Sequence, residues 1–176
     1  RNVNYAFFQN VRKGDVESSM KVTFEGQDGV AVRTHFLPES GGEVYLGDAP
    51  SVRRADEDGT QLNQYRMPIL MHRRKGELPL SSRFLVVHEP HNQTPFIDRV
   101  ESVEAGVGNI HLVIQHEKTT DHILLSSKHG KIETDITEFD GEVGFVRVQN
   151  EMIQEMGMWG GENLRWKNHT LNGQGV

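Results

Sequence analysis

The segment His88-Glu89-Pro90-His91 places two imidazoles and a carboxylate within four positions, and such side chains bind metal ions or transfer protons. A zinc site needs three or four converging ligands. In an extended chain, positions three apart point to opposite faces, and Pro90 prevents the helical turn that would bring His88 and His91 together. The sequence therefore predicts no metal site here, but a corner between a strand and a loop.

The flanking residues predict the elements that form this corner. Residues 84–87 read Phe-Leu-Val-Val and are apolar on both sides, as expected of a strand that is covered on both faces. Pro90 and Pro95 cannot donate to a β-ladder. We expect a central buried strand over residues 84–87 and an ordered loop over residues 88–95.

Arg33 and His35 are candidate contacts for an anionic sugar. They share one face of a predicted strand, opposite Val32 and Thr34. A polar sheet face of this kind is either a ligand surface or a solvated outer face. Both interpretations remain open from the residues alone.

Two short basic clusters interrupt the acidic chain, Arg53-Arg54 and the run His72-Arg73-Arg74-Lys75. The planar guanidinium group binds carboxylate or sulfate through paired hydrogen bonds, so Arg73 and Arg74 are candidate contacts for a polyanion. Simple surface charge is the alternative. The segment Asp56-Glu57-Asp58-Gly59 lacks the alternating ligands of a calcium loop and is interpreted as an exposed acidic turn.

Two tryptophans, Trp159 and Trp166, lie in the glycine-rich segment MGMWGGENLRW. An indole ring on a sheet can stack on the apolar face of a pyranose, and it can equally pack in a core. Trp159 is retained as a tentative sugar contact. His111 lies on the polar side of a predicted strand over residues 109–117, from which no catalytic role follows.

Period-two alternation predicts an all-β fold. Residues 20–25 and 30–36 alternate and flank the turn Gly26-Gln27-Asp28-Gly29, which predicts a hairpin. About a dozen short strands without a long helical segment favour a two-layer antiparallel β-sandwich of jelly-roll type. A helix over residues 150–158 is the alternative to a strand there. The remaining predicted strands cover residues 5–10, 43–47, 69–73, 83–88, 96–103, 109–117, 122–126, 131–134, 144–148, 151–158 and 164–167.

Composition limits the possible classes of protein. The 176 residues fit a single domain over 1–176, and no apolar run approaches the roughly 20 residues of a membrane span. A net charge of -6 argues against nucleic-acid or membrane binding, and without cysteine there is no disulfide or thiolate site. No nucleotide-binding loop, serine-hydrolase elbow or zinc-protease motif is present, and no cofactor is expected. Because the chain begins with an arginine, we expect a fragment of a longer protein.

The residues from 29 to 103 resemble the C-terminal part of heparinase II/III-like polysaccharide lyases. The resemblance lies in VRTHFLPESGGEVYLGDAPSVR, residues 32–53, and in YRMPILMHRRKGELPLSSRFLVVHEPHNQTPFIDRVESV, residues 65–103. It continues through the GEVGFVRVQN segment and the closing WGGENL, and so covers most of the chain.

This resemblance implies a C-terminal β domain that packs against the preceding catalytic domains of the same chain. It implies a parent that cleaves uronic-acid polysaccharides, such as glycosaminoglycan or alginate, by β-elimination in the periplasm or outside the cell. The family's catalytic residues lie mostly upstream, so none is assigned here and the fragment alone is expected to be inactive. Tyr45, Tyr65, His35 and His72 suit acid or base work, but their spacing selects none of them. The alternative is an autonomous binding module for anionic polysaccharide.

Overall fold

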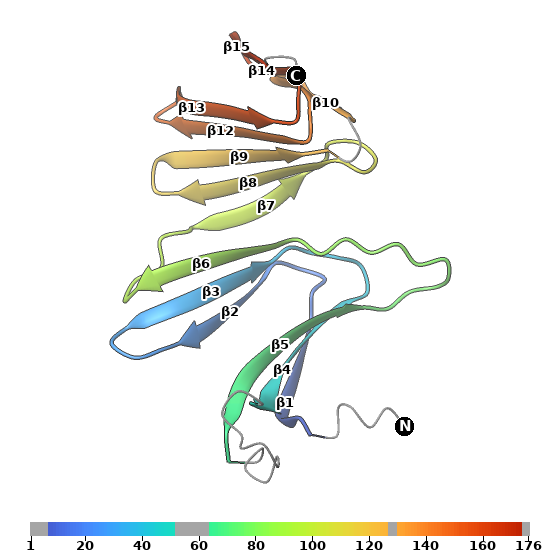
Figure 1. The fold of residues 1–176 in the computed structure, drawn as a ribbon, viewed down its shortest axis with the longest axis vertical. Coiled ribbons are helices and arrows are strands. Elements are labelled where there is room, and N and C mark those ends of the chain that lie inside the picture. Colours follow the sequence, from blue (N-terminus) through green and yellow to red (C-terminus); the bar gives the residue numbers. More distant parts are fainter. Residues whose placement is uncertain (1–6, 52–63, 127–129, 174–176) are drawn as a thin grey trace. The chain divides into compact units, whose positions relative to one another are not determined.

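The computed structural model describes residues 7–51, 64–126 and 130–173. All the helix or strand elements that these ranges contain are β-strands (Figure 1). The predicted all-β fold is confirmed. No helix in the described ranges is long and apolar enough to cross a membrane. The strands are β1 (Gln9–Asp15), β2 (Met20–Glu25), β3 (Val30–Phe36), β4 (Gly42–Pro50), β5 (Arg66–Arg74), β6 (Val86–Asn92), β7 (Arg99–Val103), β8 (Ile110–His116), β9 (Thr119–Leu125), β10 (Lys131–Glu133), β11 (Thr137–Asp140), β12 (Val143–Gln149), β13 (Met152–Trp159), β14 (Asn163–Trp166) and β15 (His169–Asn172).

These strands form four sheets, consistent with the predicted antiparallel β-sandwich. The strand orders are β1-β4-β5, β2-β3-β6, β13-β12-β9-β8-β7 and β10-β11-β14-β15. The described residues divide into two compact units, of which the first comprises 7–20, 36–51 and 64–86 and the second 21–35, 87–126 and 130–173. The single-domain prediction stays a prediction.

The first unit is built on β4, which pairs with β1 on one side and with β5 on the other. Lys13, Tyr45 and Met71 lie opposite one another across the three strands. A tight approach closes one end of the sheet, where a Cβ on Gly41 would lie 2.2 Å from the carbonyl oxygen of Lys75. Gly41 also has a φ of 72°, so only glycine fits here without strain.

The predicted hairpin of β2 and β3 is confirmed. The amide of Gly26 donates to the carbonyl of Val30 at 2.8 Å, which closes the four-residue turn. Asp28 and Gly29 both have positive φ angles, as the Asp-Gly pair predicts. The third strand of this sheet, β6, comes from much later in the chain and pairs with β3.

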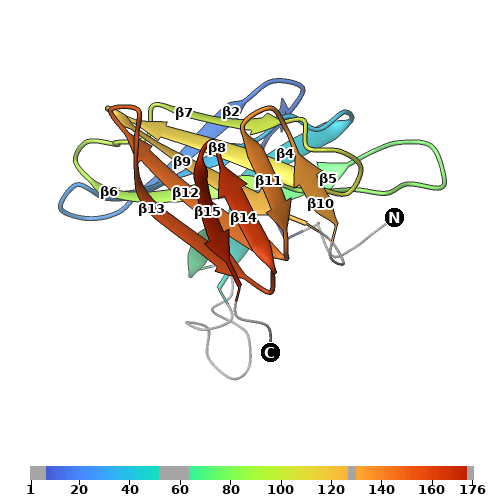
Figure 2. The same cartoon turned by 90° about the horizontal axis from the view of Figure 1, so that it is seen from above.

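Most of the second unit is a packing of two sheets. The four strands β10, β11, β14 and β15 lie side by side in one sheet (Figure 2). Its inner side chains pack against those of the five-stranded sheet, from β9 and β12, because alternate residues of each strand point inward. The shared core consists of Leu124, Ile132, Phe139, Val146, Leu164 and Trp166.

The structure corrects several expectations. Residues 84–87 are not a buried central strand, because Phe84 is 46% exposed and β6 begins only at Val86. The expected loop over residues 88–95 is also wrong in its first half, since β6 runs through Asn92. Pro90 is tolerated because β6 is an edge strand of its sheet. Residues 152–159 form the predicted strand, and the alternative of a helix there is wrong. The strands β11 and β15 were not predicted.

Candidate functional site

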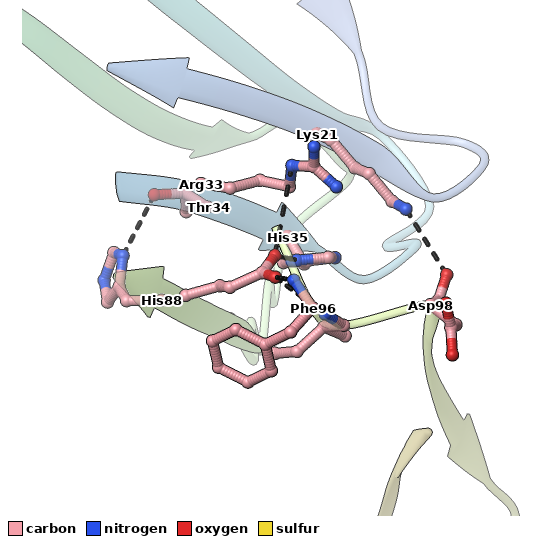
Figure 3. A network of polar contacts seen from close by, with 9 residues as sticks. Lys21, Arg33, Thr34, His35, His88, Phe96 and Asp98 are labelled. Atoms are coloured by element: carbon pink, nitrogen blue, oxygen red, sulfur yellow. Dashed lines mark hydrogen bonds and ion pairs between the residues drawn. The ribbon is translucent and has the colours of Figure 1, made fainter. Parts of the chain in front are cut away.

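Glu89 lies at the centre of a polar network on one face of the β2-β3-β6 sheet (Figure 3). Its Oε1 atom accepts hydrogen bonds from the backbone amides of Phe96 at 2.5 Å and Ile97 at 2.7 Å. Its Oε2 atom accepts one from His35 Nε2 at 2.8 Å and lies 3.9 Å from Arg33 Nε. We call these five residues the Glu89 network.

The network follows from the alternation of β3 and β6. Arg33 and His35 point to the same face of β3, as predicted, and Glu89 meets them from the neighbouring strand. On the opposite face, Thr34 Oγ1 and His88 Nδ1 are joined by a 2.9 Å hydrogen bond (Figure 3). The expected corner at residues 88–91 is thus a regular stretch of β6, with a carboxylate directed inward.

Opposing effects act on the pKa of Glu89. Burial raises it, but the hydrogen bonds from Ile97, His35 and Phe96 and the charge of Arg33 outweigh burial and lower it. The carboxylate therefore stays ionised and fixes the segment that leads into β7. Because Glu89 is 0% exposed and His35 only 3% exposed, both side chains are buried, and their hydrogen bonds tie β3 and β6 to the segment that leads into β7. The prediction of a solvated outer face is wrong for His35.

A groove of about 420 Å³ lies in the first unit, over the β1-β4-β5 sheet. Its lining is mostly apolar, with Tyr45 and Arg73 as the exceptions. Tyr45 and Arg73 lie on the same face of the sheet, because Glu43 lies opposite Arg73 and Tyr45 opposite Met71 on the two paired strands. We call this the Arg73 groove, and it is lined by Phe8, Val11, Tyr45, Leu46, Gly47, Ile69, Met71 and Arg73.

The two neighbouring arginines of the basic cluster differ in what they contact. Arg74 donates from Nε to the carbonyl of Ser40 at 2.9 Å, donates from Nη1 to the carbonyl of Ser81, and forms a 3.0 Å ion pair with Glu39. Arg73 is exposed and makes no hydrogen bond or ion pair with any residue that the structure describes. Of the two predicted anion contacts, Arg73 is therefore the available one.

Charges next to the groove are mostly neutralised. Glu43 accepts from Lys13 at 2.7 Å and from Lys75 at 2.8 Å, and the hydroxyl of Tyr45 donates to it at 2.9 Å. The hydrogen bond from Lys13, followed by that from Lys75, lowers the pKa of Glu43 to about 2. Lys13 also pairs with Asp15 at 3.1 Å. Among the charged side chains at this groove, the guanidinium of Arg73 has no partner of opposite charge within the described residues.

The two tryptophans have different environments. Trp159, at the end of β13, is 73% exposed, whereas Trp166 on β14 is 2% exposed and belongs to the core. Opposite Phe145 on β12, Gly157 of β13 has no atom within 4 Å of where a Cβ would lie. Trp159 thus has open surface beside it, and the sugar-stacking interpretation is limited to this tryptophan.

The predicted contact residues are divided between the two units. Arg33 and His35 meet at Glu89, Arg73 and Arg74 belong to the first unit, and Trp159 belongs to the second. The basic pair Arg53-Arg54 and the acidic turn Asp56-Glu57-Asp58-Gly59 lie outside the described residues. Among the described residues, no group of three or more histidine, cysteine, aspartate or glutamate side chains could hold a metal ion.

Sequence reasoning missed two features, the groove and the burial of Glu89, and a closer pattern search would have shown only the groove. Glu43, Tyr45 and Gly47 alternate along β4, and Ile69, Met71 and Arg73 alternate along β5, so each triplet defines one face. Pairing these two faces locates the groove. No local signal indicates the burial of Glu89, because it depends on a strand 54 positions away.

Comparison with protein-family models finds no match for this chain, and no curated protein or solved structure matches it.

Proposed function

We propose that this chain is a β-sandwich part of a polysaccharide lyase of the heparinase II/III type, and that it binds an anionic polysaccharide in the Arg73 groove. The observation that carries the proposal is the exposed guanidinium of Arg73, which has no partner among the described residues and lies at the side of a mostly apolar groove. A guanidinium that no described side chain engages, at the side of a concave and mostly apolar surface, can form paired hydrogen bonds with an anion.

The chemistry of the groove matches that of a uronate. A uronic acid has a carboxylate, for which the planar guanidinium forms two parallel hydrogen bonds. Its ring also has an apolar face, which packs on aromatic and aliphatic side chains such as Tyr45 and Met71. The net charge of -6 opposes nonspecific binding of polyanions, so a local cation has to supply the attraction.

In this proposal the chemical step belongs to other parts of the parent enzyme. β-Elimination needs a neutraliser of the carboxylate, a base and an acid. Tyr45 is hydrogen-bonded to Glu43 and His35 to Glu89, so the described residues provide a binding surface and a scaffold. The proposed partners are the catalytic domains of the same chain and the polysaccharide, in a periplasmic or extracellular setting.

Arg73→Ala should weaken binding to alginate or heparin oligosaccharides by about tenfold, the order expected for loss of a charge-assisted hydrogen bond. Titration calorimetry at low salt measures this. Arg73→Lys should recover only part of the affinity, since an ammonium group lacks the planar fork.

Arg12→Ala is the matched control, because it removes the same charge from β1 on the sheet face opposite Lys13. Its affinity should stay close to that of the unaltered chain. Equal losses for Arg12→Ala and Arg73→Ala would show that the groove is not the binding site.

Autonomous sugar binding through Trp159 is the second candidate, favoured by the 73% exposure of its side chain. Because Trp166 is buried in the core, a saturable change in tryptophan fluorescence on adding oligosaccharide would report Trp159. We expect Trp159→Ala to abolish that change and Trp159→Phe to weaken binding less than alanine does. Titrations that stay flat in the unaltered chain would remove this candidate.

A further inference from the structure

Two histidines, His111 on β8 and His122 on β9, lie on the face of the five-stranded sheet that packs against the four-stranded sheet. His111 is buried and His122 is half-buried. His111 Nε2 and His122 Nδ1 are 3.0 Å apart and share a hydrogen bond. The ring of Trp166 from β14 lies 4.3 Å from the His122 ring and 6.1 Å from the His111 ring, centroid to centroid. This histidine pair therefore forms part of the contact between the two sheets.

The sequence interpretation of His111 is corrected here. The polar side of β8 was expected to decorate the outside of a half-buried strand. His111 is instead buried, and it shares the inward face of its sheet with Leu124, which lies opposite it on β9. The imidazole pair is thus a polar element inside a largely apolar interface.

The hydrogen bond indicates which nitrogens carry protons. His111 Nδ1 is buried and makes no hydrogen bond with any described residue. Leaving a buried N–H without an acceptor costs more free energy than leaving a buried nitrogen lone pair without a donor. We assign the proton to His111 Nε2, which donates to His122 Nδ1, so that both rings are neutral.

The surroundings oppose a positive charge on either ring. The strand neighbours Val103 on β7, Val113 on β8 and Val146 on β12 are uncharged. The four-stranded sheet contributes Ile132, Phe139, Leu164 and Trp166 to the same core. An added proton would therefore place a cation among apolar side chains.

Two charged residues act on the pair. Asp121 favours protonation of His122, but this carboxylate is already bound by Arg147 through two hydrogen bonds of 2.7 Å and lies 3.5 Å from His116. Lys167 opposes protonation. Burial, with the repulsion from His111 next, lowers the pKa of His122 to about 4, and burial lowers the pKa of His111 as well.

We propose that the histidine pair is an acid-sensitive latch: neutral, it holds the four-stranded sheet against the five-stranded sheet, and protonated, it releases that sheet. A proton taken up by His122 Nδ1 removes the acceptor of the shared hydrogen bond, and a proton taken up by His111 Nδ1 places a positive charge in the interface. The second proton is then repelled by the first at a separation of 3.0 Å. Opening the interface lets water solvate the charge, so acid favours the open state.

The sign of the effect follows from linkage. His122 has a folded pKa of about 4 and an ordinary value of 6.5, so between these pH values the open chain binds more protons than the closed one. The latch is fully closed above pH 6.5 and weakens as the pH falls toward 4. The equilibrium constant for opening should rise on the order of 100-fold across this range.

Trp166 reports the opening directly. In the full chain with Trp159→Phe, Trp166 is the remaining tryptophan, and acrylamide quenching measures its access to solvent. Quenching should be weak at pH 7 and should increase reversibly toward pH 4.5. The protection factors of the β14 amides, which are exchange rates corrected for the intrinsic rate at each pH, should fall over the same range.

His122→Gln tests the cause, since glutamine is polar and does not titrate. It should reduce the pH dependence of quenching above pH 4.5, because only His111 of the pair is left to titrate, whereas the control His116→Gln, on the opposite face of the sheet, should retain the full dependence. Two results would overturn the latch. One is a pH dependence of quenching that is the same with and without His122→Gln. The other is quenching that does not change with pH in the Trp159→Phe chain with all its histidines. If His122→Gln does not fold, titration of the imidazole by NMR decides, and a midpoint at or above 6.5 contradicts the proposal.

Discussion

Replacing Glu89 by alanine should lower the free energy of unfolding by about 3–5 kcal/mol, the usual cost of removing one partner from a buried charged network. The substitution leaves the amides of Phe96 and Ile97 without an acceptor and His35 without its hydrogen bond. Each buried unsatisfied donor costs about 1–3 kcal/mol. Urea denaturation of the full chain measures the loss.

Glu25→Ala provides the control, because Glu25 is an exposed glutamate at the end of β2 in the same sheet. Its effect should stay within about 0.5 kcal/mol, as for most surface substitutions. The loss in free energy of unfolding for Glu89→Gln should lie between those of Glu25→Ala and Glu89→Ala, since the amide oxygen still accepts hydrogen bonds from the backbone. A loss below about 1 kcal/mol for Glu89→Ala would show that the network contributes little to stability.

The same carboxylate has a pH signature. Its pKa in the folded chain lies below the ordinary value of 4.5, so as the pH falls the unfolded chain takes up this proton first. The stabilisation is present above pH 4.5 and is lost as the pH falls through the folded pKa. As the pH falls through this range, the free energy of unfolding of Glu89→Ala should therefore decrease less than that of the unaltered chain.

The second large effect concerns Phe139, which is fully buried between the two sheets of the second unit. Phe139→Ala should cost about 3–5 kcal/mol, because a large cavity replaces the ring. Gly144 lies against this ring, and a Cβ there would be 3.1 Å from one ring carbon and 3.2 Å from another. Gly144→Ala should therefore cost about 1–3 kcal/mol in the unaltered chain through overpacking.

The double variant tests this contact. Once the ring is absent, the methyl group of Gly144→Ala enters the space it leaves, so the double variant should be more stable than the sum of the single effects. The coupling should be at least about 0.5 kcal/mol, as for residues in contact. Strict additivity of the two free-energy changes would show that the ring and the glycine do not constrain each other.

The sequence determined the strands of this protein more securely than their environments. Alternation and the Asp-Gly turn were sufficient to predict β2 and β3, because a hairpin depends on neighbours in the chain. The strand positions over residues 42–50 and 110–116 were also predicted within a few residues. The four-residue β11 and β15 were missed, since such short segments have little alternation to detect.

Only the tertiary structure decided which polar residues are buried and which are available. Glu89 was expected at a corner, His111 on an outer face and His35 on a ligand surface or an outer face, yet all three are buried. They meet residues from strands distant in sequence, Glu89 and His35 each other and His111 the ring of Trp166. Arg73 and Arg74 are adjacent and chemically identical, yet Glu39, Ser40 and Ser81 engage only Arg74. Period two assigns a side chain to a face, but which face is covered depends on pairings made across the whole chain.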